Sequence, residues 1–117
     1  MAGIYIHIPF CKSRCIYCGF FSTTSLEQRR RYMDALLREL TLRQDFLTSA
    51  PVETIYFGGG TPSQLPLDEI ERILSHLHNI YNVREDAEVT LEGNPDDLTS
   101  PYLQSLRRLG INRLSMG

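Results

Sequence analysis

Residues 52–63 have the sequence "VETIYFGGGTPS", in which a strand-like run meets a glycine-rich loop without a break. The run at 52–57 is rich in β-branched and aromatic residues, which is typical of a buried strand. Because glycine and proline disfavour both regular elements, we expect the strand to end at Phe57. Loops of this kind after a strand often bind a phosphate or a cofactor. The lysine of a nucleotide-binding P-loop is missing, which argues against a nucleotide triphosphatase.

Segments typical of strands and of helices alternate on both sides of this stretch. Apolar residues recur at helical spacing before it and after it, and the second of these helices has Asp68 and Glu69 in its first turn, where the helix dipole favours negative charge. The expected elements are a strand at 3–8, a helix from Leu26 to about Leu47, a strand at 52–57, a helix over 67–81, a strand at 87–92, a helix capped by Thr99 or Ser100 and stopped by Gly110, and a strand at 111–116.

The order βαβαβαβ predicts an α/β fold, with a parallel sheet, right-handed crossovers and covering helices. A length of 117 residues corresponds to about one domain, so we expect a single domain over residues 1–117. The last predicted strand has no helix after it, and four strands are too few to close a barrel. We therefore expect the chain to be a fragment, or a deliberately short chain, of something larger.

The composition indicates an ordinary globular protein, with 42% hydrophobic and 22% charged residues. A net charge of -2 gives no support for nucleic acid as a partner, because phosphate binding relies on a basic surface. No apolar run approaches the roughly 18 residues needed to cross a bilayer. The N-terminus also lacks the basic region and cleavage site of a secretory signal, so a cytoplasmic location is predicted.

All three cysteines lie in "CKSRCIYC", residues 11–18. In a reducing compartment a disulfide framework is not expected, and three thiols would leave one unpaired. Structural zinc takes four ligands, so a distant histidine such as His7 would have to complete the set. An iron-sulfur cube held by three cysteines would instead keep one iron open to a small molecule. The cysteines alone leave both metal sites open.

The chemically suggestive residues all follow the carboxyl end of a predicted strand. The cysteines follow the first strand, Gly58 to Ser63 follow the second, Glu92 and Asn94 lie at the end of the third, and Ser115 lies near the end of the fourth. Parallel α/β sheets and barrels bind their ligands at that edge. One shared ligand site is therefore predicted there.

Several of these segments resemble a known family. The motif "CKSRCIYC" resembles the signature of the radical S-adenosylmethionine (SAM) superfamily, and "GGGTPS" looks like the glycine motif that binds SAM in it. Four longer segments together resemble the oxygen-independent coproporphyrinogen III oxidase branch, especially its haem-chaperone relatives. They are "YIHIPFCKSRCIYCGF", "YFGGGTPS", "LEGNPDDLT" and "LGINRLSMG". The resemblance runs from Tyr5 to Gly117 and implies the N-terminal part of a radical SAM (βα) partial TIM barrel.

The resemblance also implies cofactors. Active members reduce a [4Fe-4S] cluster, which cleaves SAM bound to its open iron and makes a 5'-deoxyadenosyl radical. Carried over to this sequence, the cluster ligands are Cys11, Cys15 and Cys18, the tyrosines that line the SAM pocket are Tyr5 and Tyr17, the residues near the methionine end are Gly59, Gly60 and Thr61, and Glu92 contacts SAM.

One position departs from the oxidase pattern. The oxidase has a further cysteine two residues after the third, where this chain has Phe20. The haem-chaperone branch typically lacks that cysteine, so the resemblance favours a haem chaperone, with haem, a haem-acceptor protein and an electron donor as partners. The alternatives are an anaerobic coproporphyrinogen III dehydrogenase, which decarboxylates its substrate to protoporphyrinogen IX, and a small zinc-binding structural module.

Other polar residues have simpler interpretations. His7 is expected to be a core or near-site residue rather than a metal ligand. His76 and His78 flank the apolar stripe of the second helix, so both are predicted to face solvent. Asn94 with Pro95 is typical of a turn.

Overall fold

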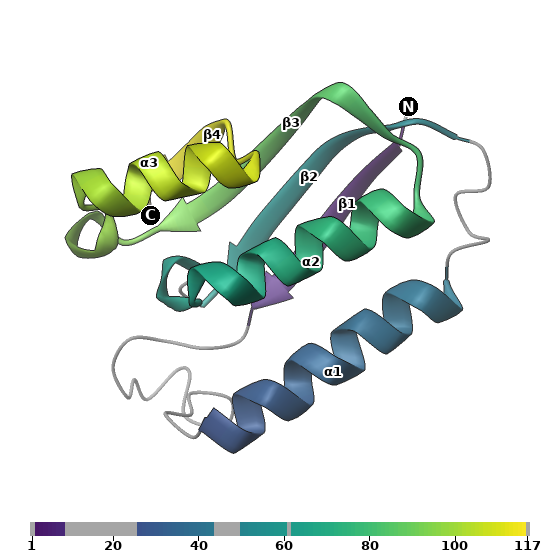
Figure 1. Cartoon of the computed structure of the whole chain (residues 1–117), viewed down its shortest axis with the longest axis horizontal. Coiled ribbons are helices and arrows are strands. Elements are labelled where there is room, and N and C mark those ends of the chain that lie inside the picture. The colour runs from purple at the N-terminus through teal and green to yellow at the C-terminus, as the bar shows by residue number, and fades with distance from the viewer. Residues whose placement is uncertain (1, 9–25, 44–49, 61, 117) are drawn as a thin grey trace.

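A computed structural model of the chain describes residues 2–8, 26–43, 50–60 and 62–116. Its four strands form one parallel sheet in the order β1-β2-β3-β4, and helices alternate with them along the chain (Figure 1). The strands are β1 (Ala2–Ile8), β2 (Val52–Gly59), β3 (Val83–Gly93) and β4 (Arg113–Met116); the helices are α1 (Leu26–Leu42), α2 (Leu67–Ile80) and α3 (Ser100–Leu109), with short 3-10 helices η3 (Pro62–Gln64) and η4 (Pro95–Asp97). The predicted α/β order is confirmed.

The two faces of the sheet differ in chemistry because successive strand residues point to opposite sides. Buried residues such as Ile6, Phe57 and Leu91 share one face, where they pack in one cluster with Met33 of α1 and Ile73 of α2. The other face carries polar and aromatic side chains, described below. The helices therefore cover one side of the sheet, and the polar side chains gather on the other.

The end of α1 differs from the prediction. The helix stops at Leu42 rather than near Leu47, which lies outside the described residues. Leu42 is 76% exposed and Arg43 is already part of a turn, so the last described residues of the helix gain little stabilising burial. The end of α3 agrees with the prediction: Gly110 adopts φ 108° and its N–H donates to carbonyls of the last turn. Within the described residues, no helix is both long and apolar enough to cross a membrane.

His76 does not simply face solvent as predicted. Its Nε2 atom lies 3.0 Å from the Leu37 carbonyl oxygen and 2.8 Å from Thr41 Oγ1, so the half-buried imidazole joins α2 to α1. Tyr81, which caps α2, donates a hydrogen bond to the Leu40 carbonyl at 3.1 Å. His78 is exposed, as expected. The two helices are thus joined by polar contacts as well as by the core.

The prediction that β2 ends at Phe57 is wrong, because Gly58 and Gly59 continue the strand and pair with His7 and Ile8 of β1. A Cβ atom on Gly58 would lie 2.7 Å from the phenol oxygen of Tyr5 on that neighbouring strand. The glycines therefore permit the close approach of β1 and β2 instead of ending the pairing.

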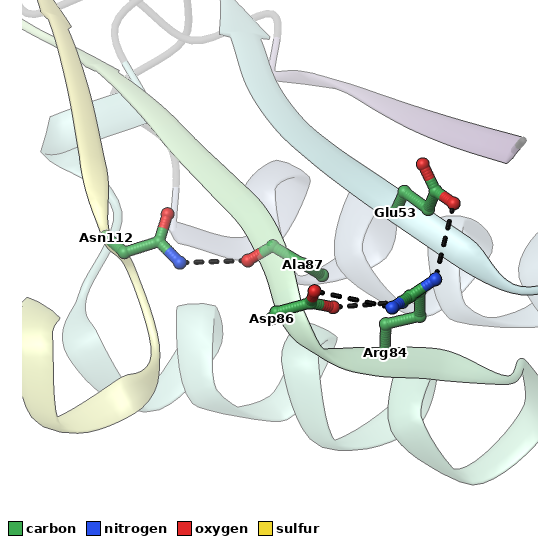
Figure 2. Close-up of polar contacts among 5 residues, drawn as sticks. All are labelled: Glu53, Arg84, Asp86, Ala87 and Asn112. Carbon is green, nitrogen blue, oxygen red and sulfur yellow. Dashed lines mark hydrogen bonds and ion pairs between the residues drawn. The ribbon is translucent and has the colours of Figure 1, made fainter.

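The start of β3 was also missed, since the strand begins at Val83 rather than at residue 87. Residues 84–86 near its start are charged and exposed, so they do not show the apolar pattern from which a strand is predicted. Arg84 donates to Asp86 at 2.9 Å and lies 3.6 Å from Glu53 of β2, so ion pairs accompany the strand pairing there (Figure 2). Such exposed ion pairs contribute little to the free energy of unfolding. Charged residues also form no apolar periodicity that would predict a strand.

The side chain of Asn112 attaches the start of β4 to β3. Its Oδ1 accepts a hydrogen bond from the Val89 N–H at 2.8 Å, and its Nδ2 donates to the Ala87 carbonyl at 2.9 Å, as Figure 2 shows for the second bond. The Asn112 N–H donates to the Val89 carbonyl at 3.0 Å. One residue thus completes three bonds to the edge of β3 before the regular pairing begins.

We expect Asn112→Ala to lower the free energy of unfolding by about 2 kcal/mol, because two side-chain hydrogen bonds to half-buried backbone groups are lost together. Urea denaturation of the purified protein measures this change. Asn79→Ala, which truncates an exposed asparagine of α2, is the matched control and should shift stability by less than about 0.5 kcal/mol. Equal effects of the two substitutions would contradict the role of Asn112.

Candidate functional site

The strand register brings the predicted site residues to one edge of the sheet. Gly59 pairs with Ile8 at the end of β1, and Glu92 of β3 pairs with Ser115 of β4. Because all four strands are parallel, their carboxyl ends lie at the same edge. The predicted convergence is confirmed for the described residues.

The carboxylate of Glu92 is held by two donors from β2. The phenol of Tyr56 donates to Oε2 at 2.6 Å, and the N–H of Gly59 donates to Oε1 at 3.1 Å. The first distance lies in the range of charge-assisted O–H···O⁻ hydrogen bonds. This bond to Glu92 is the main reason that the pKa of Tyr56 is raised, and a hydrogen bond with Ser115 opposes the shift. Glu92 is therefore an oriented acceptor at the sheet edge rather than an ordinary surface carboxylate.

Two stacked tyrosine rings lie beside this carboxylate. Tyr5 of β1 stacks on Tyr56 with ring centroids 5.7 Å apart and planes 14° apart, and 57% of Tyr5 is exposed. The Tyr5 phenol oxygen is 3.4 Å from Nδ1 of the exposed His7. The site thus offers an accessible aromatic surface and an imidazole next to an oriented acceptor, and His7 is a near-site residue as expected.

The glycine loop is bound tightly to the end of β1. Gly59 has φ 111°, and a Cβ atom there would lie 2.6 Å from the Ile8 carbonyl oxygen. The N–H of Gly60 donates to the same oxygen at 2.7 Å. The phenol of Tyr32 on α1 donates to the neighbouring carbonyl of His7. The last residues of β1 are therefore held by both the loop and α1.

A buried serine joins the loop after β2 to the loop after β3. Ser63 is only 5% exposed; its hydroxyl donates to Asp97 Oδ2 at 2.9 Å and accepts from the Asn94 N–H at 3.0 Å. The phenol of Tyr102 donates to the Ser63 carbonyl at 3.1 Å, and burial, with the nearby Asp97 charge, raises the pKa of Tyr102 to about 12. Asn94 itself caps η4, which confirms the predicted turn.

The described residues include only part of the predicted site. Cys11, Cys15, Cys18, Tyr17 and Thr61 lie outside the described residues.

The other residues predicted to bind SAM lie near one another. Gly59, the last residue of β2, donates to Glu92, and Gly60 follows it directly. Tyr5 stacks on Tyr56, which also binds Glu92. Their roles toward a ligand stay predictions. Sequence reasoning missed Tyr56, although its position in the period-two pattern of β2 places it on the polar face with Glu92.

The carboxylate acceptor and the aromatic ring at this edge fit a small cationic cofactor that carries hydrogen-bond donors. Each Glu92 oxygen accepts one bond from the protein and keeps acceptor capacity for a ligand ammonium or hydroxyl group. The exposed ring of Tyr5, stacked on Tyr56, presents an apolar face that suits a planar base or a methylene chain. SAM has an ammonium group, a sulfonium group, ribose hydroxyls and an adenine ring, so the described edge suits it.

Comparison with known proteins agrees with this geometry. The profile of the Radical SAM superfamily matches residues 5–117. The heme chaperone HemW of Synechocystis is 40% identical over 120 residues, which cover 97% of this chain and 29% of HemW. Anaerobilin synthase of Escherichia coli O157:H7 is 37% identical, with 97% of this chain and 26% of that protein covered.

Coproporphyrinogen III oxidases also match this chain. Oxygen-independent coproporphyrinogen III oxidase of Salmonella typhimurium is 35% identical, with 98% of this chain and 26% of the oxidase covered. The solved structure of coproporphyrinogen III oxidase (HemN) from Escherichia coli, a radical SAM enzyme, matches with a TM-score of 0.83 and 35% identity over 98% of this chain and 27% of that chain. The chain thus spans less than a third of the length of these relatives.

Fold and comparison together define an α/β protein whose four-stranded parallel sheet matches the N-terminal part of a radical SAM enzyme. The chain belongs to the radical SAM superfamily, within the group that includes HemW heme chaperones and oxygen-independent coproporphyrinogen III oxidases. Membership implies a [4Fe-4S] cluster and SAM as cofactors. The predicted family and fold class are confirmed.

Proposed function

We propose that residues 1–117 form one domain, the N-terminal portion of a radical SAM core, in a haem chaperone that binds haem and delivers it to an acceptor protein. The observation that carries the cofactor part of this proposal is the carboxylate of Glu92, held by Tyr56 and Gly59. It lies at the same sheet edge as the end of β1, after which the cysteine motif follows in sequence. A cytoplasmic location suits this function, because cysteines there stay reduced.

Two groups of residues would hold the cofactors. Cys11, Cys15 and Cys18 would ligate the cluster, which leaves one iron for SAM. The residues toward SAM would be Tyr5, Tyr17, Gly59, Gly60, Thr61 and Glu92. When bound and reduced, the cluster supplies the electron that cleaves SAM. The task of this chain is ligation and orientation, and the cofactor carries the chemistry.

The choice of a chaperone over an enzyme rests on Phe20, which occupies the position of the additional cysteine in the oxidase pattern. The 40% identity to a heme chaperone supports it. The second candidate is an anaerobic coproporphyrinogen III dehydrogenase, which the 35% identity to the oxidases favours. The zinc module rested on the number of cysteines alone, and the family assignment removes its basis.

The test uses the protein in a form that continues past residue 117, reconstituted anaerobically with iron and sulfide. We expect the reduced sample to give the EPR signal of a [4Fe-4S] cluster, and the signal to shift when SAM is added. The same protein should bind haem stoichiometrically and leave coproporphyrinogen III unchanged. Formation of protoporphyrinogen IX, or of another new tetrapyrrole, would overturn the chaperone assignment. Absence of the cluster would overturn the whole proposal.

A further inference from the structure

We propose that Tyr56 is a positioning residue whose phenol orients the Glu92 carboxylate for the ligand at the sheet edge. The inference rests on the proposed SAM site and adds to it a residue that the family resemblance did not assign. Tyr56 acts through Glu92 rather than through direct contact with the cofactor.

The pairing of the strands makes this contact possible. Tyr56 is opposite Thr90 in the β2–β3 register, so Glu92 is its diagonal neighbour two residues further along β3. Diagonal neighbours on one face are within reach of long and aromatic side chains. The Tyr56 phenol and the Gly59 N–H bind different oxygens of the carboxylate, at 2.6 Å and 3.1 Å. Two donors on two oxygens fix the plane of the carboxylate as well as its position.

The position of the Tyr56 ring is itself determined by its neighbours. Tyr5 stacks on one face of the ring, with the centroids 5.7 Å apart. A Cβ atom on Gly58 would lie 2.8 Å from Tyr56 Cε1, so only glycine leaves room for the ring in this place. Ser115 of β4 pairs with Glu92 and acts on the phenol by opposing the rise in its pKa. Residues from β1 and β2 therefore support the contact that Tyr56 makes with β3.

The protonation of Tyr56 suits this role. The hydrogen bond to Glu92 is the largest cause that raises the pKa of the phenol above its ordinary value near 10. The phenol is protonated throughout the neutral range even at its ordinary pKa, and the raised pKa extends its ability to donate to a higher pH. An acceptor that is oriented before the ligand arrives loses less conformational freedom on binding, which favours affinity.

The first experiment measures SAM binding to the cluster-loaded protein by anaerobic EPR titration. We expect Tyr56→Phe to raise the SAM dissociation constant about tenfold, as expected for a lost hydrogen bond to a charged group, with unchanged cluster content. Tyr81→Phe is the matched control, since it removes a phenol hydrogen bond to Leu40 on the helix side and should leave SAM affinity unchanged. Unchanged affinity in Tyr56→Phe would overturn the inference.

A double-mutant cycle separates positioning from a general structural role. If Tyr56 acts through Glu92, Tyr56→Phe should cause no further loss of SAM affinity in the Glu92→Ala background. The same cycle on the unfolding free energy of the cofactor-free protein should show coupling between the two residues. A full additional loss in the Glu92→Ala background would overturn the inference. A wild-type protein that binds no SAM would instead overturn the proposed function itself.

Discussion

Replacing Gly59 by alanine is expected to destabilise the protein by about 3 kcal/mol, and to weaken SAM binding in parallel. Gly59 has φ 111°, which an L-residue adopts only with strain, and the new Cβ atom would lie 2.6 Å from the Ile8 carbonyl oxygen. That carbonyl accepts the Gly60 N–H, so it cannot move away without breaking the contact between the loop and β1. Any shift of Gly59 also moves the N–H that holds Glu92.

Gly110 provides the control for backbone strain. It has φ 108°, close to that of Gly59, but a Cβ atom there meets nothing within 4 Å. Gly110→Ala should therefore cost about 1 kcal/mol from strain alone and leave SAM binding unchanged. Urea denaturation of both variants isolates the effect of the steric overlap at Gly59. Equal loss of stability in the two variants would show that the close approach to Ile8 does not matter.

The second large effect is expected at the cysteines. Cys15→Ala should abolish the [4Fe-4S] cluster rather than weaken it, because the chain has three cysteines in total and the cluster is expected to use all of them. Iron and sulfide analysis after anaerobic reconstitution, together with EPR of the reduced sample, measures the loss. Binding of SAM should disappear at the same time, since the open iron is its anchor in the proposed site.

Ser13→Ala is the control in the same loop, because it removes a polar side chain between the cysteines without removing a thiol. It should retain the full content of iron and sulfide. A [4Fe-4S] signal that persists in Cys15→Ala would show that Cys15 is not a ligand. Loss of the cluster in Ser13→Ala as well would indicate that the loop tolerates no change, and the loss in Cys15→Ala would then carry no evidence of ligation.

Much of the fold could be predicted because its signals are local. The β-branched and aromatic residues of "VETIYF" and the helical stripe that contains Ile70, Ile73 and Leu77 each indicate an element without reference to the rest of the chain. The prediction failed where local chemistry and tertiary pairing disagree. Gly58 and Gly59 have low strand propensity, yet they pair with β1, and Arg84 and Asp86 belong to β3 although they are exposed.

The sequence by itself determined the order of strands and helices, the sheet edge at which Gly59 and Glu92 meet, and the family. Only the tertiary structure decided which side chains touch there. Tyr56 and Glu92 are 36 residues apart and Ser63 and Asp97 are 34 apart, so no local pattern pairs them. Their contacts depend on the register between neighbouring strands, where a slip of one residue would turn each side chain to the opposite face. Packing of the core against the helices sets that register, and packing is a property of the whole fold.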